Sequence, residues 1–291
     1  MPCYHPLPAW RKRELGESGK LAITFTRTDS FDFLPMEVPC GTCIGCRLDR
    51  ARQWALRCMH EAKCHEQNAF VTLTYDDSSL PSNGSLVPER FVLFMKRLRF
   101  SRYPGLRFFH CGEYGDKTDR PHHHALLFNC EFPDRVHFKG SAGSEFELWS
   151  SDELQRLWGY GHCSIGEVTA ASAGYVARYT LKKSFSPGFY KDRIPPYLTM
   201  SRRPGLGSEF AKQHYKSWFY HDSVVVDGVE LKPGRYYDSL CEKWAPRLLA
   251  RAKRKRRQAA NLSPDNTGAR LIVREEVKRS AISTLIRPLE D

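Results

Sequence analysis

The sequence predicts an α+β protein, because helix-like and strand-like stretches both occur and two strands follow each other closely enough to pair antiparallel. Residues 70–75 alternate in polarity and are rich in β-branched side chains, as in a half-buried strand. Residues 106–111 are apolar and aromatic, and a polar loop with Gly115 and Pro121 joins them to the apolar residues 125–128. These two segments are therefore expected to form a hairpin in an antiparallel sheet.

The N-terminal third adds a strand and two helices. Residues 21–26 are a strand candidate that follows a proline-rich start. Residues 47–66 contain good helix formers, no Gly or Pro, and apolar residues at three-to-four spacing, which predicts a helix with one buried face. A second helix is expected at 88–100, where Pro88 and Glu89 lie in the first turn and an apolar stripe follows.

The rest of the chain alternates between short elements and loops. A capping-box pattern at 150–153 predicts the start of a short helix that ends at Gly159. The other elements expected, in chain order, are a strand at 162–168, a helix at 170–183, a linker rich in Pro, Gly and Arg at 184–207, a helix at 208–219 and a hairpin around Asp227-Gly228.

The composition favours an acidic polymer as the partner. The 291 residues carry a formal net charge of +12, and the pI of the sequence is about 9.3. Nucleic acid is the first candidate and an anionic membrane surface the second. A membrane is not expected, because no apolar run approaches the roughly 20 residues of a spanning helix and the N-terminus lacks a signal-peptide pattern. In an intracellular protein, the ten cysteines predict a metal site plus buried thiols rather than disulfides.

Three cysteines at two-residue spacing, Cys40, Cys43 and Cys46, form a tight knuckle with glycines between them. Such spacing makes thiolates converge and predicts a structural Zn²⁺ site, with Cys3 as the fourth ligand because a chain end can swing in. The competitors for that fourth position are Cys58, His60, Cys64 and His65. An iron–sulfur cluster can use the same local spacing, but nothing else indicates redox chemistry. The plainer alternative is a set of unpaired buried thiols.

Three histidines, His122 to His124, run into the apolar strand of the hairpin. Alternate side chains of a strand share a face, so His122 and His124 point to one side and His123 to the other. The hairpin would bring Glu113 beside the pair. Two imidazoles and a carboxylate suit a divalent cation that also holds a substrate oxygen. The alternative is that these histidines are structural or lie on the surface.

The helix at 170–183 carries Tyr175 and Tyr179 at positions i and i+4, so their phenols lie on one face about 6 Å apart along the axis. Lys182 shares that face. A tyrosine pair at this spacing is more often core packing, but a buried ammonium group needs a partner. Beside a metal site, a tyrosine could instead attack the phosphorus of a phosphodiester, with Lys182 or Arg178 balancing the charge.

Basic residues near these motifs and in the tail are candidate DNA contacts, although such runs are usually solvated helix faces. Six of the seven residues from 251 to 257 are basic. The candidates are Arg47, Arg50, Arg178, Lys183, Arg254, Lys255 and Arg256.

The order of these motifs resembles the HUH endonucleases of rolling-circle replication. The resemblance rests on Glu113, the histidines 122–124 and the Tyr-Val-Ala-Arg-Tyr helix, in that order, after the strand at 70–75. Two tyrosines separated by three residues are similar to the superfamily-one initiators. With the cysteine knuckle before Arg47 and Trp54, the chain looks closest to the gokushovirus branch of the microviruses. One departure is His123, where the family prefers a bulky apolar residue.

The resemblance implies a ferredoxin-like or RRM-like core, with an antiparallel sheet and helices on one side. The chain is expected to divide into three segments: a zinc module and basic helix at 1–66, a nuclease core at 67–200 and a C-terminal accessory region at 201–291. The resemblance also implies that Mg²⁺ or Mn²⁺ assists a tyrosine that nicks one DNA strand at an origin, in the cytoplasm of a host cell. Since the chain has no phosphate-binding Gly-x-x-x-x-Gly-Lys-Ser/Thr loop, a host helicase and polymerase are expected as partners.

Two rival functions remain open at this point. A zinc-dependent hydrolase could use Glu113, His122 and His124 without any tyrosine. A non-catalytic nucleic-acid-binding protein could combine a zinc knuckle, a basic tail and an RRM-like sheet, and it would bind DNA in a salt-sensitive way without cutting it.

Overall fold

The structure is a computed structural model with two compact units. It describes residues 3–16, 19, 21–31, 34–101, 104–115, 118–138, 147–182, 189–190 and 192–284. The first unit combines Met1–Arg50 with Arg257–Ile286, and the second is built from Ala51–Arg256. The division into three segments stays a prediction, although residues after 200 contribute to both units.

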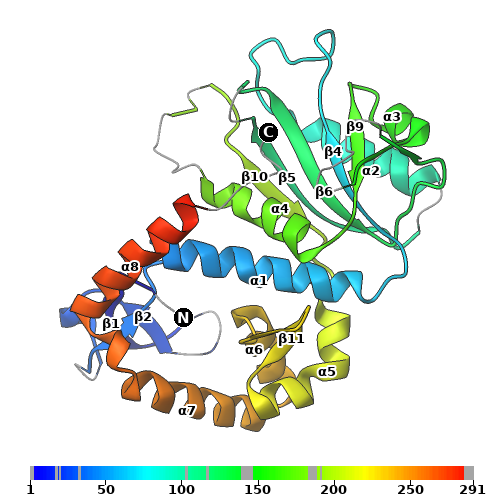
Figure 1. Cartoon of the computed structure of the whole chain (residues 1–291). Helices are drawn as coiled ribbons and strands as arrows, with labels where there is room; N and C mark the ends of the chain where they lie inside the picture. Colours follow the sequence, from blue (N-terminus) through cyan, green and yellow to red (C-terminus); the bar gives the residue numbers. More distant parts are fainter. Residues whose placement is uncertain are drawn as a thin grey trace. The chain divides into compact units, whose positions relative to one another are not determined.

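The second unit contains a seven-stranded sheet in which all neighbouring strands are antiparallel, as predicted (Figure 1). The strand order is β10-β5-β6-β4-β9-β8-β7. The strands are β4 (Asn68–Leu73), β5 (Arg107–Tyr114), β6 (Pro121–Phe128), β7 (Val136–His137), β8 (Trp149–Ser150), β9 (Cys163–Gly166) and β10 (Tyr197–Met200). The linker expected at 184–207 therefore contains an edge strand, β10.

The four middle strands follow a split β-α-β pattern. The chain runs β4, α2 (Pro88–Ser101), β5, β6, α3 (Asp152–Trp158) and β9, and the sheet order of these strands is β5-β6-β4-β9. The short helix predicted to begin near residue 150 and end at Gly159 is confirmed as α3, but its N-cap is Ser151 and not Ser150 of the predicted capping box. Its N-cap Ser151 accepts a hydrogen bond from the backbone of Leu154, and Gly159 ends the helix in the left-handed region, with φ of 72°.

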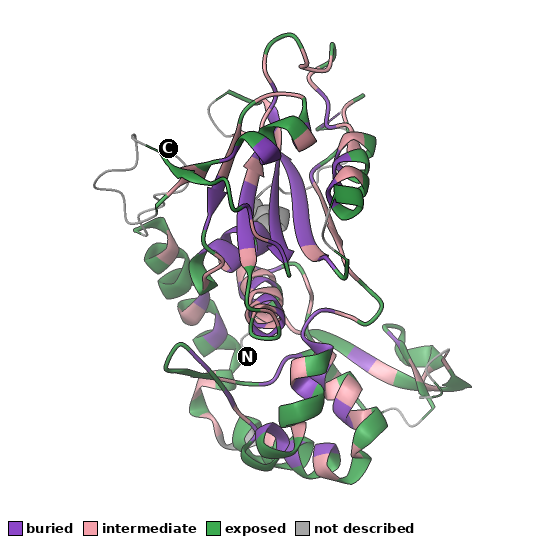
Figure 2. Ribbon diagram, turned by 90° about the vertical axis from the view of Figure 1, so that its right-hand side faces the viewer, coloured by how far each residue is buried: buried purple, intermediate pink, exposed green. Residues whose placement is uncertain are grey.

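Helices cover both faces of the sheet, which corrects the expectation of helices on one side. On one face α2 and α3 pack Phe94, Leu98 and Trp158 against β4 and β6. On the other face α4 (Ala170–Lys182) and the later part of α1 (Ile44–Ala62) pack against the same strands, and Trp54 stacks on Phe109. The strands are accordingly buried on both sides (Figure 2). The motifs behind the resemblance contain nothing that places α1 on the sheet.

A smaller core completes the second unit. It is formed by α5 (Ser208–His221), β11 (Val224–Val226), β12 (Val229–Leu231), α6 (Arg235–Trp244) and the start of α7 (Pro246–Leu262). The predicted hairpin is confirmed: Asp227 and Gly228 both have positive φ, at 49° and 77°, as a tight type I′ turn requires.

The first unit has a three-stranded sheet and a C-terminal helix. Its strands are β1 (Leu7–Leu15), β2 (Leu21–Thr24) and β3 (Met36–Val38), in the order β2-β1-β3. The helix α8 (Gly268–Ser283) supplies Leu271 to a small core with Tyr4, and Glu275 Oε2 lies 2.6 Å from His5 Nε2. Among the described residues, no helix is long and apolar enough to cross a membrane.

Candidate active site and cysteine cluster

Glu113, His122 and His124 meet on the α4 face of the sheet, and we call them the Glu–His–His cluster. Glu113 lies directly opposite His122 in the register of β5 and β6. The Oε1 atom of Glu113 is 2.9 Å from His122 Nε2 and 3.0 Å from His124 Nε2. Glu113 and His124 are only 2% and 5% exposed, and His122 is half-buried. The face assignment made from strand alternation is thus seen in the structure.

Hydrogen bonds on the far side of each ring orient the two imidazoles. His122 Nδ1 lies 3.1 Å from the carbonyl oxygen of Arg120, which can only accept, so Nδ1 carries a proton and Nε2 is directed at Glu113. His124 Nδ1 lies 2.9 Å from Thr72 Oγ1 on β4, which can accept in the same way. Such outer partners fix the tautomer of metal-binding histidines. Only strand pairing brings Thr72 to His124, so no pattern within the sequence reveals it.

The donor set of the Glu–His–His cluster fits a divalent cation. Its ligand atoms lie within 4.8 Å of one another. The N–O separations near 3 Å match the edge of an octahedron whose bonds are about 2.1 Å long. Two histidines and a carboxylate also leave other coordination positions for substrate oxygens.

Tyr175 borders this cluster. It lies on α4, and its ring meets the His124 ring edge to face, with centroids 5.1 Å apart. It is 6% exposed and packs against Phe70. Tyr179 lies one turn further along the same helix, as the spacing predicts. The side chains of Tyr179 and Lys182 lie outside what the structure describes, so their distance to the cluster stays untested.

A reciprocal cap begins α4. Thr169 Oγ1 accepts a hydrogen bond from the backbone N–H of Ser172 at 3.1 Å, and Ser172 Oγ accepts one from the backbone N–H of Thr169 at 2.9 Å. This is a capping box with serine in the place of the usual glutamate, which is why the sequence pattern did not reveal it. The cap fixes the start of the helix that carries the tyrosines.

The four cysteines predicted as a metal site come together in the first unit, and we call them the cysteine cluster. The thiols of Cys3, Cys40, Cys43 and Cys46 lie within 4.8 Å of one another. Backbone N–H groups point at the sulfurs: Cys40 N is 3.2 Å from Cys3 Sγ, and Cys43 N is 3.3 Å from Cys40 Sγ. Burial raises the pKa of the Cys40 thiol, but hydrogen bonds from the backbones of Cys43 and Thr42 outweigh it and lower the pKa to about 6.

The competitors of Cys3 are occupied elsewhere. Cys58 lies on α1 and is fully buried in the core between the helices and the sheet of the second unit. The ring of His60 bonds Tyr237 Oη at 2.8 Å, and His65 faces Glu61 at 3.4 Å. Cys64 directs its thiol at the carbonyl of His60. The donor chemistry of four thiols is the set that structural Zn²⁺ takes in tetrahedral sites.

The predicted DNA contacts differ in their exposure. Arg50, Arg178, Arg254 and Lys255 are exposed, and Arg47 is half-buried. Arg256 is held by two carboxylates, with Nη2 2.6 Å from Asp222 Oδ1 and Nη1 2.7 Å from Asp238 Oδ2. These ion pairs favour a structural role for Arg256 over a DNA contact. Lys183 lies outside the described residues.

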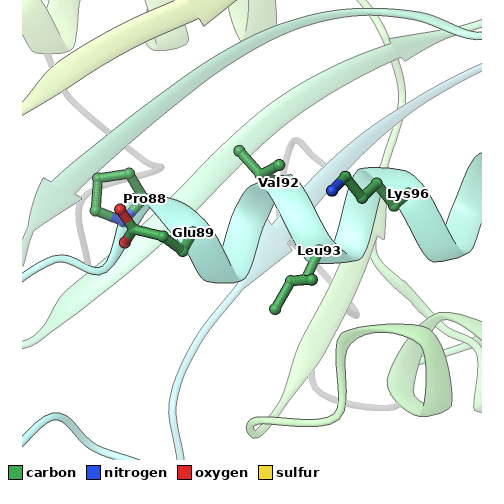
Figure 3. Close-up of a pocket in the computed structure, with 5 residues that line it drawn as sticks. All are labelled: Pro88, Glu89, Val92, Leu93 and Lys96. Atoms are coloured by element: carbon green, nitrogen blue, oxygen red, sulfur yellow. The ribbon is translucent and has the colours of Figure 1, made fainter.

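A shallow hollow of about 300 Å³ lies along the outer side of α2 (Figure 3). Its lining consists of Pro88, Glu89, Val92, Leu93 and Lys96. All five belong to α2, which covers the face of the sheet opposite the Glu–His–His cluster. The hollow is therefore separate from the candidate active site.

Comparisons with known proteins agree with the family that the order of the motifs suggests. A family model described as replication-associated protein ORF2/G2P matches residues 68–184, which include every described member of the candidate active site. The chain is 34% identical over 256 residues to replication-associated protein VP4 of Bdellovibrio phage phiMH2K, covering 84% of this chain and 79% of that protein. It is 36% identical over 221 residues to replication-associated protein ORF2 of Spiroplasma virus 4, covering 71% and 68%.

A more distant relative is replication-associated protein ORF4 of Chlamydia phage 1, which is 28% identical over 218 residues, or 71% of this chain and 54% of that protein. No solved structure gives a significant match.

Proposed function

Because the chain belongs to the family of phage replication-associated proteins, we propose that it initiates rolling-circle replication by nicking one DNA strand with a tyrosine and a divalent metal. The relatives place it in phage replication, in agreement with the resemblance to microvirus initiators. The observation that carries the finer proposal is Tyr175 beside His124, in contact with a cluster of two histidines and a carboxylate.

The Glu–His–His cluster would hold Mg²⁺ or Mn²⁺. Such an ion polarises the non-bridging oxygens of a phosphodiester and offsets the charge that develops there. Glu113 supplies the anionic ligand, while Arg120 O and Thr72 fix the two imidazoles, so the donor atoms need no reorganisation before DNA binds.

Tyr175 or Tyr179 would be the nucleophile. The phenol loses its proton to solvent, its oxygen bonds to phosphorus, and the bond from phosphorus to the 3′ oxygen breaks. The products are a 5′-phosphotyrosine and a 3′ oxygen, which takes up a proton to become the hydroxyl that primes synthesis. Arg178 is exposed on the same helix and, with Lys182, would balance charge on the phosphate. The second tyrosine would cut the regenerated origin, and the freed 3′-hydroxyl would then attack the first phosphotyrosine and close a circle.

The cysteine cluster would bind Zn²⁺ as a structural ion. The proposal includes single-stranded origin DNA as the substrate, with Arg47, Arg50, Arg254 and Lys255 as further candidate contacts. A host helicase and a host polymerase would separate and copy the strands in the host cytoplasm.

The test is a denaturing gel of end-labelled single-stranded origin DNA, incubated with protein and Mn²⁺ and run without protease. We expect a band shifted by covalently bound protein, lost with EDTA and lost in the Tyr175→Phe/Tyr179→Phe double variant. Each single variant shows which tyrosine acts first. Cleavage without an adduct, unaffected by the double variant, would replace the proposal with a metal hydrolase. Binding without any cleavage would leave only a DNA-binding protein.

A further inference from the structure

A line of hydrogen bonds crosses four neighbouring strands on the face of the sheet opposite the Glu–His–His cluster. Its members are Thr199 on β10, His110 on β5, His123 on β6 and Tyr75 just beyond β4. We propose that this line, which we call the four-strand ladder, positions the strand that carries the two ligand histidines and thereby sets the metal affinity of the cluster. The inference rests on the proposed function, because it concerns that same metal site.

Every bond of the ladder has good length, and the two bonds made by His123 are buried, whereas the bond to Thr199 is partly buried. His110 Nδ1 is 2.9 Å from Thr199 Oγ1, and His110 Nε2 is 3.0 Å from His123 Nδ1. His123 Nε2 is 3.0 Å from Tyr75 Oη. Both imidazoles are 0% exposed, and Tyr75 is 4% exposed. Phe91 of α2 stacks on His110 with centroids 3.4 Å apart, so apolar rings enclose the polar line.

The ladder behaves as one unit because of how imidazoles share protons. A neutral imidazole has one donor and one acceptor nitrogen. Once one ring donates to the other, the direction of both outer bonds is set as well. Removing either end therefore leaves a buried polar group unsatisfied and weakens the whole line.

The ladder reaches the metal site through the backbone of β6. His123 lies between His122 and His124, and side chains alternate along a strand. An anchor on His123 therefore fixes the peptide units that direct both ligand side chains to the other face. A shift of one residue in register would turn both ligands away from Glu113. This assigns a role to the histidine found where the family prefers an apolar residue: it binds the ladder and not the metal.

The experiment is calorimetric titration of Mn²⁺ into full-length protein whose cysteine cluster is already loaded with Zn²⁺. Thr199→Val and Tyr75→Phe remove one hydroxyl from each end of the ladder with little change in shape. Each is expected to raise the Mn²⁺ dissociation constant by about tenfold, the range seen for outer-shell partners of metal ligands. The double variant should raise the Mn²⁺ dissociation constant by less than the product of the two single-variant factors, because the bonds act together. Thr199→Ser, which restores a hydroxyl, should bind like wild type.

Leu98→Ala is the matched control, since Leu98 is fully buried in the same core but makes no ladder bond. It should lower the melting temperature and leave Mn²⁺ affinity unchanged. The ladder proposal is overturned if Leu98→Ala weakens Mn²⁺ binding as much as Thr199→Val. It is also overturned if both ladder variants bind Mn²⁺ like wild type while Glu113→Gln abolishes Mn²⁺ binding. In that case the proposed metal site is supported although the ladder proposal fails. Wild-type protein that binds no Mn²⁺ would overturn both proposals.

Discussion

The two candidate metal sites of this protein are built in opposite ways. Glu113, His122 and His124 lie on adjacent paired strands, where the register of the sheet places every ligand. The cysteine cluster draws Cys3 from a chain end and the other thiols from a loop and the first turn of α1. Ligands on a sheet are held by backbone hydrogen bonds, whereas ligands in loops are held mainly by the ion that they bind.

The surroundings of the two clusters sharpen the contrast. The Glu–His–His cluster lies over a sheet buried on both faces by two large cores. The buried core around the cysteine cluster consists of Tyr4, Cys43, Cys46 and Leu271, so two of its four members are the proposed ligands. The Glu–His–His cluster should therefore keep its geometry when its ion is lost. The first unit should unfold when the cysteine cluster loses its ion.

Zinc removal gives the largest expected effect. Structural Zn²⁺ contributes about 10–16 kcal/mol of apparent binding free energy in small zinc domains, so the Cys43→Ser variant should lose the folded first unit. Hydrogen exchange followed by mass spectrometry should show protection lost at 36–50 and 268–283, while 107–128 stays protected. Cys64→Ser, which changes an exposed thiol outside the cluster, is the control. Unchanged hydrogen exchange in the first unit would show that its fold does not depend on the cysteine cluster, and the two sites would then not differ in this respect.

Loss of a ligand from the sheet site should affect activity and not folding. His124→Ala is expected to lower the nicking rate at least about 1000-fold, because the ion supplies several kcal/mol of charge stabilisation and about 1.4 kcal/mol corresponds to a factor of ten. The rate of cleavage of a labelled oligonucleotide measures this, beside a thermal melt. A melting temperature that collapses together with activity would show that the sheet does not preform this site.

Thr72 offers a finer probe of preorganisation. Thr72→Val removes the hydroxyl 2.9 Å from His124 Nδ1 and should weaken Mn²⁺ binding by 10- to 100-fold, about the range for outer-shell partners. Thr74→Val is the control, because Thr74 Oγ1 bonds the carbonyl of His162 and does not contact the cluster. Equal affinities of the two variants in calorimetry would mean that the sheet alone orients His124.

The smallest expected effect concerns the helix of the tyrosines. Ser172→Ala breaks one half of the reciprocal cap and should destabilise the start of α4 by about 1 kcal/mol. Hydrogen exchange should rise in the first turns of α4 and remain unchanged in Ser217→Ala, an exposed serine within α5. If the first turn of α4 exchanges like wild type, packing and not the cap holds the tyrosine helix in place.

The sequence was sufficient to predict which site residues come together where those residues lie close in the chain. Strand alternation and a short loop placed Glu113 with His122 and His124, and helical spacing put Tyr175 and Tyr179 on one helix. The knuckle spacing brought three cysteines together, and the choice of Cys3 depended only on the freedom of a chain end. Apart from Cys3, which lies 37 positions before Cys40, the residues involved are neighbours in the chain or are joined by one connection.

Pairings between residues far apart in the chain could not be predicted from the sequence. Thr72 and His124 are 52 positions apart, and His110 and Thr199 are 89 apart. No periodicity within a segment reveals which strand lies beside it, so β10 was taken for a linker. For the same reason nothing indicated that α1 would cover the second face of the sheet, and the expected helices were placed on one side only.

The two ligand histidines differ in how much mutation they can tolerate nearby. The ring of His122 is oriented by a main-chain carbonyl, that of residue 120, which every amino acid provides. The side chain at position 120, which in this chain bonds Asp77 and the carbonyl of Tyr75, could therefore change without removing the acceptor that orients His122. The ring of His124 depends on a hydroxyl at position 72, so that position has little freedom to drift. A single candidate site can therefore combine one evolutionarily permissive support with one that is restrictive.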